Sequence, residues 1–173
     1  TLYENVFQLL PGEYLKLDIQ TSSLSTVTWY NLKNISTRKT TTKLAISKFK
    51  ELFSSAIKLR FRADVSVGAC LSGGIDSTSI VSMLDVIHTG RQKIYTFSSV
   101  FPGHKIDESA YIDEIVSQKK LISYKNYPSF EDFLEKLDSI LYHQDLPFLG
   151  TSVFAQWSTF QSAKKEGVTV LLD

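Results

Sequence analysis

A Ser-Gly-Gly turn, followed after one apolar residue by a carboxylate and two hydroxyls, is the stretch of this sequence best suited to chemistry. Residues 68–79 read GACLSGGIDSTS, so an apolar run ends at Ser72 and polar residues begin. Glycines allow backbone conformations closed to other residues and let a ligand approach the main chain. Successive N–H groups in such a turn bind anions, helped by the positive end of a following helix. We therefore predict a phosphate-binding loop in which Ser72, Ser77 and Thr78 add hydroxyl donors.

Asp76 would repel a phosphate chain unless a cation lay between the two groups. Mg²⁺ is commonly held by one or two carboxylates together with phosphate oxygens, so we predict that Asp76 is a magnesium ligand. The alternative is that Asp76 only caps a helix and the glycines only form a turn. No lysine occurs between Arg62 and Arg91, as GxxxxGK[ST] would require, and the glycine spacing differs from GxGxxG. The loop therefore belongs to another type.

The elements around this loop alternate between strand and helix patterns. Short apolar runs predict strands at residues 67–71, 93–101, 121–127 and 168–172. Apolar residues at helical spacing predict one helix that begins at Lys43. The same spacing predicts four further helices, at residues 77–88, 107–119, 130–143 and 152–166. This order predicts right-handed crossovers and a parallel sheet with helices on both faces, a Rossmann-like α/β fold. Ligands bind such sheets outside the carboxyl ends of the strands, where the Ser-Gly-Gly turn lies.

Some of these elements have further expected features. Asp107 is predicted to cap the helix that follows it, and this capping explains Asp107 and Glu108 more simply than a metal site does. In the helix at 130–143, the side chains expected to point inward are Phe133, Leu134, Leu137 and Leu141. Residues 1–35 differ in character, because two short strand patterns around a turn are followed by the polar run NISTRKTTT.

Composition excludes several classes of protein. The 173 residues are 43% hydrophobic and 21% charged, as in ordinary soluble domains. A net charge of +1 gives no attraction to nucleic acid or to an anionic membrane, and no apolar run is long enough to span a bilayer. Cys70 is the single cysteine, which excludes an internal disulfide and fits a reducing, cytoplasmic location. His88, His104 and His143 lack the short spacing of zinc ligands.

The motifs resemble one known family in order and in kind. SGGIDS resembles the SGGxDS pyrophosphate loop of the N-type ATP pyrophosphatases, and RFRADVSVGACLSGGIDSTSI is similar to the synthetase domain of the glutamine-hydrolysing asparagine synthetases. Further segments resemble the family and occur in the same order as in its members: TFSSVFPG, DESAYI, HQDLPFLGTSVFAQW and AKKEGVTVLLD. LPGEYLKLD and TVTWYNL resemble the end of its glutaminase domain. The resemblance implies a glutaminase remnant with linker at residues 1–35 and, at 36–173, a truncated domain of the adenine nucleotide α-hydrolase-like fold.

The resemblance also implies a reaction that belongs to asparagine biosynthesis. With ATP and Mg²⁺, the side-chain carboxylate of aspartate attacks the α-phosphorus, pyrophosphate leaves, and ammonia derived from glutamine displaces AMP to give asparagine. The implied partners are therefore small molecules, and the resemblance leaves a homo-oligomer open. Its implied ATP-binding residues are Leu71, Ser72, Gly73, Gly74, Ile75, Asp76 and Ser77, with Ser99 beside the adenine. Thr151 and Ser152 match a segment near the amino-acid substrate, with a simple loop and helix cap as the alternative.

The sequence departs from the family in three places. Relatives usually have proline where Ser66 stands, and the family's GxGxDE segment and glutaminase cysteine lie outside these residues. We therefore expect no catalytic residue here, no asparagine synthesis by this piece alone, and self-association through its open sheet. Two rival functions stay open. One is a pyrophosphate-loop enzyme acting on another acid, such as a β-lactam synthetase or another amidotransferase, and the other is a non-catalytic nucleotide-binding module.

Overall fold

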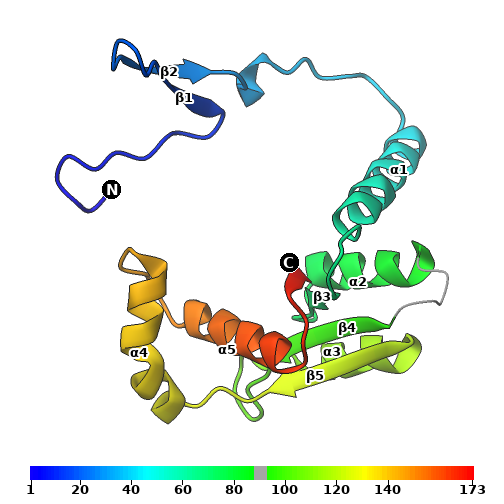
Figure 1. The fold of residues 1–173 in the computed structure, drawn as a ribbon. Coiled ribbons are helices and arrows are strands. Elements are labelled where there is room, and N and C mark those ends of the chain that lie inside the picture. Colours follow the sequence, from blue (N-terminus) through cyan, green and yellow to red (C-terminus); the bar gives the residue numbers. More distant parts are fainter. Residues whose placement is uncertain (88–92) are drawn as a thin grey trace. The chain divides into compact units, whose positions relative to one another are not determined.

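The chain divides into two compact units. A computed structural model describes residues 1–87 and 93–173, and the units comprise residues 1–45 and 46–173 (Figure 1). The sequence predicts a change of domain after residue 35, within the first unit. Among the described residues, no helix is both long and apolar enough to cross a membrane.

The first unit contains an antiparallel hairpin and a short 3-10 helix, Leu32–Asn34. Strands β1 (Glu13–Leu17) and β2 (Leu24–Thr28) confirm the two strands predicted here. The turn between them is closed by Asp18, whose Oδ1 accepts from the backbone N–H groups two and three residues further on, both at 2.9 Å. Such Asx hydrogen bonds are a common reason for aspartate in a tight turn.

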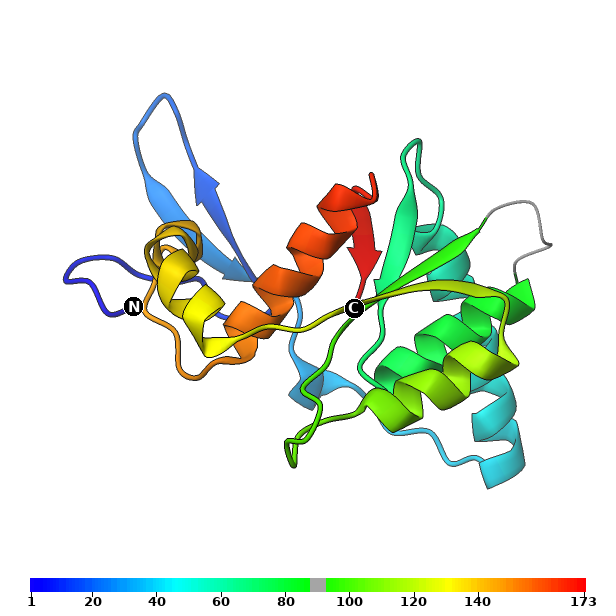
Figure 2. The same cartoon turned by 90° about the horizontal axis from the view of Figure 1, so that it is seen from below.

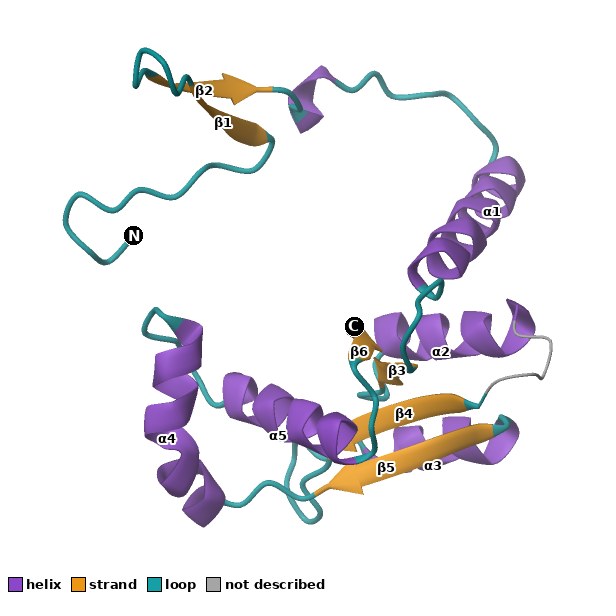
Figure 3. Ribbon diagram, in the orientation of Figure 1, coloured by secondary structure: helices purple, strands orange, loops and turns teal. Residues whose placement is uncertain are grey.

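Strands and helices follow one another through the second unit in the order predicted from the apolar periods (Figure 3). The bounds are α1 Thr42–Arg60, which begins at the end of the first unit, β3 Val67–Cys70, α2 Ile75–Ile87, β4 Ile94–Ser99, α3 Ser109–Gln118, β5 Leu121–Asn126, α4 Phe130–Gln144, α5 Ser152–Lys165 and β6 Val170–Leu172. Strands and helices alternate up to α4, which is followed directly by the helix α5. Helix α2 begins two residues before the predicted start at Ser77, and its predicted end at His88 lies outside the described residues.

The four strands of the second unit form one parallel sheet in the order β5-β4-β3-β6. In register, Ala69 of β3 lies opposite Thr96 of β4 and Leu172 of β6. The predicted α/β fold with a parallel sheet is therefore confirmed. Because the strands run in the same direction, the turn after β3 and the ends of β4 and β5 lie at one edge of the sheet.

Helices cover both faces of the sheet (Figure 2), and each face has its own apolar core. The core on the side of α2 and α3 contains the buried residues Ile57, Ala69, Leu71, Val81, Leu84, Ile94, Val100 and Ile112. The core under α5 contains Phe97, Ala163 and Val168. The strands between them read as short continuous apolar runs because both of their faces are covered.

Helix α4 differs from the expectation that four of its apolar residues point inward. Leu134 is 56% exposed and Leu141 is 41% exposed, whereas Ile140 is fully buried. The reason is that α4 packs on α5, with the Phe133 ring edge-on to the Phe154 ring at 5.4 Å. A helix that packs on one neighbouring helix buries a narrower stripe than one that lies across a sheet.

Candidate functional site

Gly73 occupies a turn position that strongly disfavours residues with a side chain. Its φ is +83°, a conformation rarely adopted by residues with a Cβ. A Cβ built at this position would also lie 2.9 Å from the Cβ of Tyr111 and 3.4 Å from the carbonyl oxygen of Glu108. The turn after β3 is thus packed against the start of α3, and Gly73 is needed for the fold itself.

Gly74 is different, and the prediction that both glycines adopt special conformations is wrong for it. Among the described residues it is not one of the glycines with positive φ, and a Cβ built there would meet only the Ser72 hydroxyl, at 3.4 Å. Its carbonyl accepts from Thr78 N at 3.0 Å, the hydrogen bond with which α2 begins. The fold therefore does not need glycine at this position, and the space that it leaves is open to a ligand.

Several backbone amides of the turn have no acceptor. Within residues 1–87 and 93–173, nothing accepts a hydrogen bond from the N–H of Gly73, Ile75 or Asp76. These amides lie at the N-terminus of α2, where the helix dipole is positive. Two other amides of the turn are already bonded within it, Ser72 N to the Ser77 hydroxyl at 3.2 Å and Gly74 N to the Ser72 hydroxyl at 3.4 Å. The turn is therefore a preformed set of donors for an anion.

Two of the three predicted hydroxyl donors point into the protein. Ser77 is 8% exposed, and its Oγ donates to the carbonyl of Gly74 at 3.3 Å. The Thr78 hydroxyl is buried and has no partner among the described residues. Ser72 is exposed, so it is the hydroxyl that lies at the surface of the turn. Ser77 holds the turn in shape from inside.

Asp76 and Ile75 lie in the first turn of α2, and both are exposed. In the described part of the chain, the Asp76 carboxylate makes no hydrogen bond or ion pair, and no group of three acidic, histidine or cysteine side chains gathers closely enough to hold a metal ion. Mg²⁺ is normally bound by one or two carboxylates together with substrate phosphates, and an unpaired carboxylate beside free amides fits that arrangement.

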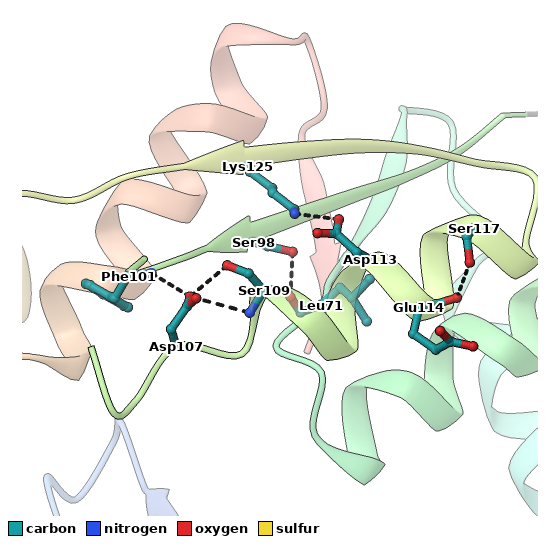
Figure 4. Close-up of polar contacts among 9 residues, drawn as sticks. All are labelled: Leu71, Ser98, Phe101, Asp107, Ser109, Asp113, Glu114, Ser117 and Lys125. Atoms are coloured by element: carbon teal, nitrogen blue, oxygen red, sulfur yellow. Dashed lines mark hydrogen bonds and ion pairs between the residues drawn. The ribbon is translucent and has the colours of Figure 1, made fainter. Parts of the chain in front are cut away.

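A cavity of about 420 Å³ adjoins the turn at the carboxyl ends of β3 and β4. Ligand pockets commonly begin at about 300 Å³. The predicted site residues that line this cavity are Leu71, Ser72, Ser99 and Ser152. Leu71 contributes its backbone to the cavity wall, because its side chain lies in the core. The Leu71 carbonyl accepts a hydrogen bond from the Ser98 hydroxyl at 2.5 Å (Figure 4).

Thr151 and Ser152 lie at the start of α5. Thr151 precedes the helix, and its hydroxyl makes no capping hydrogen bond. Its carbonyl accepts from the backbone N–H of Phe154 at 3.0 Å. The alternative of a side-chain cap therefore does not explain Thr151. Ser152 lies in the cavity wall on the same side as Gln156 and Thr159, one and two turns further along the helix.

The sequence predicts that Asp107 caps α3, and this prediction is wrong. The helix begins at Ser109, and the residue at the cap position is Glu108. The Oδ1 of Asp107 instead accepts from Phe101 N at 3.0 Å and from the Ser109 hydroxyl at 2.7 Å (Figure 4). These hydrogen bonds, with that from the Ser109 hydroxyl the largest cause, lower the pKa of Asp107. Asp107 thus fixes the loop between β4 and α3, and Glu108 lines the cavity.

Cys70 and Asp173 also line the cavity, and sequence reasoning did not find this pair. Burial above all, and then the charge of Asp173 and the hydrogen bond to it, raise the pKa of the Cys70 thiol to about 12. Gln156 Nε2 donates to the same carboxylate at 3.3 Å. A thiol with this pKa stays protonated at neutral pH, so Cys70 is no nucleophile. The adjacency of β3 and β6 is the signal that would have predicted the pair.

Comparisons with known proteins agree with this geometry. The family model described as asparagine synthase matches residues 48–173. A putative glutamine-hydrolyzing asparagine synthetase 2 of Methanocaldococcus jannaschii is 34% identical over 99% of the chain and 33% of its own length. Glutamine-hydrolyzing asparagine synthetase 1 of Bacillus subtilis is 28% identical over 73% of the chain and 20% of its own length. A putative glutamine-hydrolyzing asparagine synthetase of Mycobacterium bovis is 30% identical over 69% of the chain and 18% of its own length. The chain thus spans a third or less of these relatives.

Proposed function

The chain belongs to the asparagine synthase family, and from that premise we propose that it supplies the ATP-binding part of a synthetase that forms an amide at the expense of ATP. The observation that carries this proposal is the set of unbonded amides at Gly73, Ile75 and Asp76, which opens beside a cavity at the carboxyl edge of the sheet. Amides without acceptors, at a helix N-terminus, bind the anionic end of a nucleotide. The names of the relatives support asparagine as the product.

In the proposed reaction, the side-chain carboxylate of aspartate attacks the α-phosphorus of ATP. The bond to the β-phosphate breaks, which gives aspartyl-adenylate and pyrophosphate, and ammonia derived from glutamine then displaces AMP. The amides of Gly73 and Ile75 would donate to the leaving pyrophosphate, where negative charge increases during transfer. Asp76 would hold Mg²⁺, which supplies neutralisation of charge on the phosphates when bound.

The remaining roles follow from position. We assign the pyrophosphate to residues 72–77, the nucleoside to the cavity wall at Leu71 and Ser99, and the amino-acid substrate to the region of Thr151 and Ser152. Residues 36–173 would then be part of the synthetase domain, and residues 1–35 the end of a glutaminase domain with its linker. A cytoplasmic location fits a pathway whose substrates are cytoplasmic metabolites.

The direct test is calorimetric titration of the purified chain with ATP and Mg²⁺. We expect saturable binding that is lost in Gly74→Val, because the added side chain fills the space beside the free amides while the fold has no need of glycine there. Circular dichroism of Gly74→Val should match that of the wild type. The reaction class is tested with the longest available form of the protein, by product analysis with ATP, aspartate and an ammonium salt. AMP and pyrophosphate are expected, and ADP with phosphate would exclude this class.

A further inference from the structure

The loop between β4 and α3 borders the cavity at both of its ends. Phe101, two residues after β4, and Glu108, directly before α3, both line the cavity wall. Glu108 also adjoins the Ser-Gly-Gly turn, because its Cβ would lie 3.5 Å from a Cβ built on Gly73. The loop therefore runs from one wall of the cavity to the free amides of the turn.

The base of this loop is fixed. Asp107 Oδ1 accepts from Phe101 N at 3.0 Å and from the Ser109 hydroxyl at 2.7 Å, which ties the two ends of the loop together (Figure 4). Between these ends the backbone forms two consecutive turns. His104 N donates to the Phe101 carbonyl at 3.0 Å, and Asp107 N donates to the His104 carbonyl at 3.1 Å. A loop with fixed ends can move at its tip without disturbing the elements that it joins.

The tip of the loop, residues 102–106, is held by few contacts. In the described part of the chain, none of its side chains makes a hydrogen bond or an ion pair. All five residues are exposed, and Ile106 is 70% exposed although it is apolar. A Cβ built on Gly103 would have no heavy atom within 4 Å. Segments with so few packed contacts open and close at little cost in free energy.

Charge gives the tip a partner. Among the described residues, the side chains that line the cavity include two carboxylates, Glu108 and Asp173, and no lysine or arginine. No basic residue occurs between Arg62 and Arg91 either, so the Ser-Gly-Gly turn offers a phosphate chain only amides and hydroxyls. Lys105 is an unpaired cation on the tip. It lies three residues before Glu108, so their Cα atoms are at most about 11 Å apart.

We propose that residues 102–106 are a lid that closes over the bound triphosphate and brings Lys105 onto its β- and γ-phosphates, an inference that rests on the proposed binding of ATP. Lysine binds phosphates as a point charge on a flexible stem. Closure excludes water, which strengthens this ion pair and the hydrogen bonds from the amides of the turn. The exposed Ile106 side chain is covered in the closed state, which favours closure further.

Limited digestion with trypsin measures closure directly, because trypsin cuts the bond after Lys105 only while the tip is open. We expect saturating ATP with Mg²⁺ to slow this cut at least about 10-fold, as in a lid that is closed in about nine-tenths of the molecules. Pyrophosphate with Mg²⁺ should also slow it, whereas AMP should have little effect because it lacks the β- and γ-phosphates. The bond after Lys39, in the coil before α1, is the internal reference and should be cut at an unchanged rate.

Substitution of Lys105 measures its contribution to affinity. Lys105→Gln, which removes the charge, should weaken the binding of ATP with Mg²⁺ about 3- to 10-fold in calorimetry, and high salt should reduce this difference. Lys105→Arg keeps the charge and should stay within about 2-fold of the wild type. Lys120→Gln is the matched control, because it makes the same change in net charge. Lys120 is exposed, has no partner among the described residues, and precedes β5 at the opposite edge of the sheet.

The outcomes separate this inference from the proposed function. If ATP binds but leaves the cut after Lys105 unchanged, or if Lys105→Gln binds ATP as tightly as the wild type does, the lid is wrong and ATP binding stands. If AMP protects the bond as well as ATP does, the loop closes on the nucleoside, and the pairing of Lys105 with the phosphates is wrong. If the wild-type chain does not bind ATP, the proposed function itself is wrong, and this inference fails with it.

Discussion

The hydroxyl of Ser77 lies 3.0 Å from the hydroxyl of Ser72, across the turn that joins β3 to α2. Ser77 is in the first turn of the helix, and the same oxygen accepts from Ser72 N and donates to the carbonyl of Gly74. The turn is therefore held from its inner side, by the helix that it introduces. A binding site that keeps its shape without its ligand loses less conformational freedom on binding.

Removal of this inner contact should loosen the turn. In Ser77→Ala, we expect the free energy of unfolding to fall by about 1 kcal/mol, because partly buried groups lose a hydrogen-bond partner. ATP affinity should fall about 3- to 10-fold, because the free amides are no longer fixed in place. Urea unfolding and calorimetry measure the two effects. Ser79→Ala, in the same helix, is the control and should change both by little. Equal ATP affinity in wild type and Ser77→Ala would show that the contact has no role in binding.

The two glycines of the turn should respond in opposite ways to substitution by alanine. Gly73→Ala should lower the free energy of unfolding by about 1–2 kcal/mol or more, because φ is positive and the new methyl group would overlap Tyr111. Gly74→Ala should cost less than about 1 kcal/mol. We nevertheless expect Gly74→Ala to weaken ATP binding at least about 10-fold, because its methyl group occupies the space beside the free amides. Normal ATP binding by Gly74→Ala would place the phosphates elsewhere.

Asp76 should make the binding of ATP depend on magnesium. In the wild type, we expect replacement of Mg²⁺ by EDTA to weaken ATP binding at least about 10-fold, because the carboxylate then faces the phosphates without a cation between them. In Asp76→Asn the repulsion is absent, so ATP binding without metal should be tighter than in the wild type and nearly independent of Mg²⁺. Calorimetry with and without EDTA measures this. A full magnesium effect in Asp76→Asn would show that the ion is held by other groups.

The order of strands and helices could be predicted from the sequence because each element carries its own local pattern. Short apolar runs were enough to predict β3 and β4 (Ile94–Ser99), and their spacing by helices was enough to predict a parallel sheet. The Ser-Gly-Gly turn was also predicted at the correct edge of the sheet, since the carboxyl end of β3 directly precedes it. These features depend on residues that are neighbours in the chain.

The direction of individual side chains could not be predicted in the same way. Ser77 points inward because it lies four residues before Val81 and seven before Leu84, on the face of α2 that is buried against the sheet. The Ser99 hydroxyl is hydrogen-bonded to Asn126 and Thr159, which lie 27 and 60 positions away in the sequence, so no local pattern connects these residues. Prediction from one sequence therefore reached the backbone of the candidate site and missed much of its hydrogen bonding.

Asp107 should contribute to the loss of stability in acid. Hydrogen bonds, from the Ser109 hydroxyl above all, lower its pKa from the ordinary value of 3.8 in the folded chain. Above pH 3.8 the carboxylate is ionised in both states, and its contribution is fully present. As the pH falls below 3.8, the unfolded chain takes up the proton first, so this contribution is lost as the pH passes through the folded pKa.

The corresponding measurement is urea unfolding between pH 5 and pH 2 for the wild type and Asp107→Asn. The variant should be less stable at pH 5 and should lose less stability on acidification, because it has no carboxylate at this position to protonate. Asp138→Asn is the control, since no described residue bonds or pairs with that carboxylate on α4, and its acid dependence should follow the wild type. Parallel curves for Asp107→Asn and wild type would contradict the role given to the Ser109 hydroxyl.

Cys70 should be unreactive towards alkylating reagents, although it lines the cavity. Burial, followed by the charge and hydrogen bond of Asp173, raises the pKa of the thiol from 9.0 to about 12. At pH 8 the reactive thiolate is then about 1,000-fold rarer than in a thiol of ordinary pKa, and alkylation by iodoacetamide should be slower by about the same factor. Asp173→Asn removes the negative charge and should speed alkylation, while burial keeps the rate below that of free cysteine. Rapid alkylation of the folded wild type, or no change in Asp173→Asn, would contradict the pairing of this thiol with Asp173.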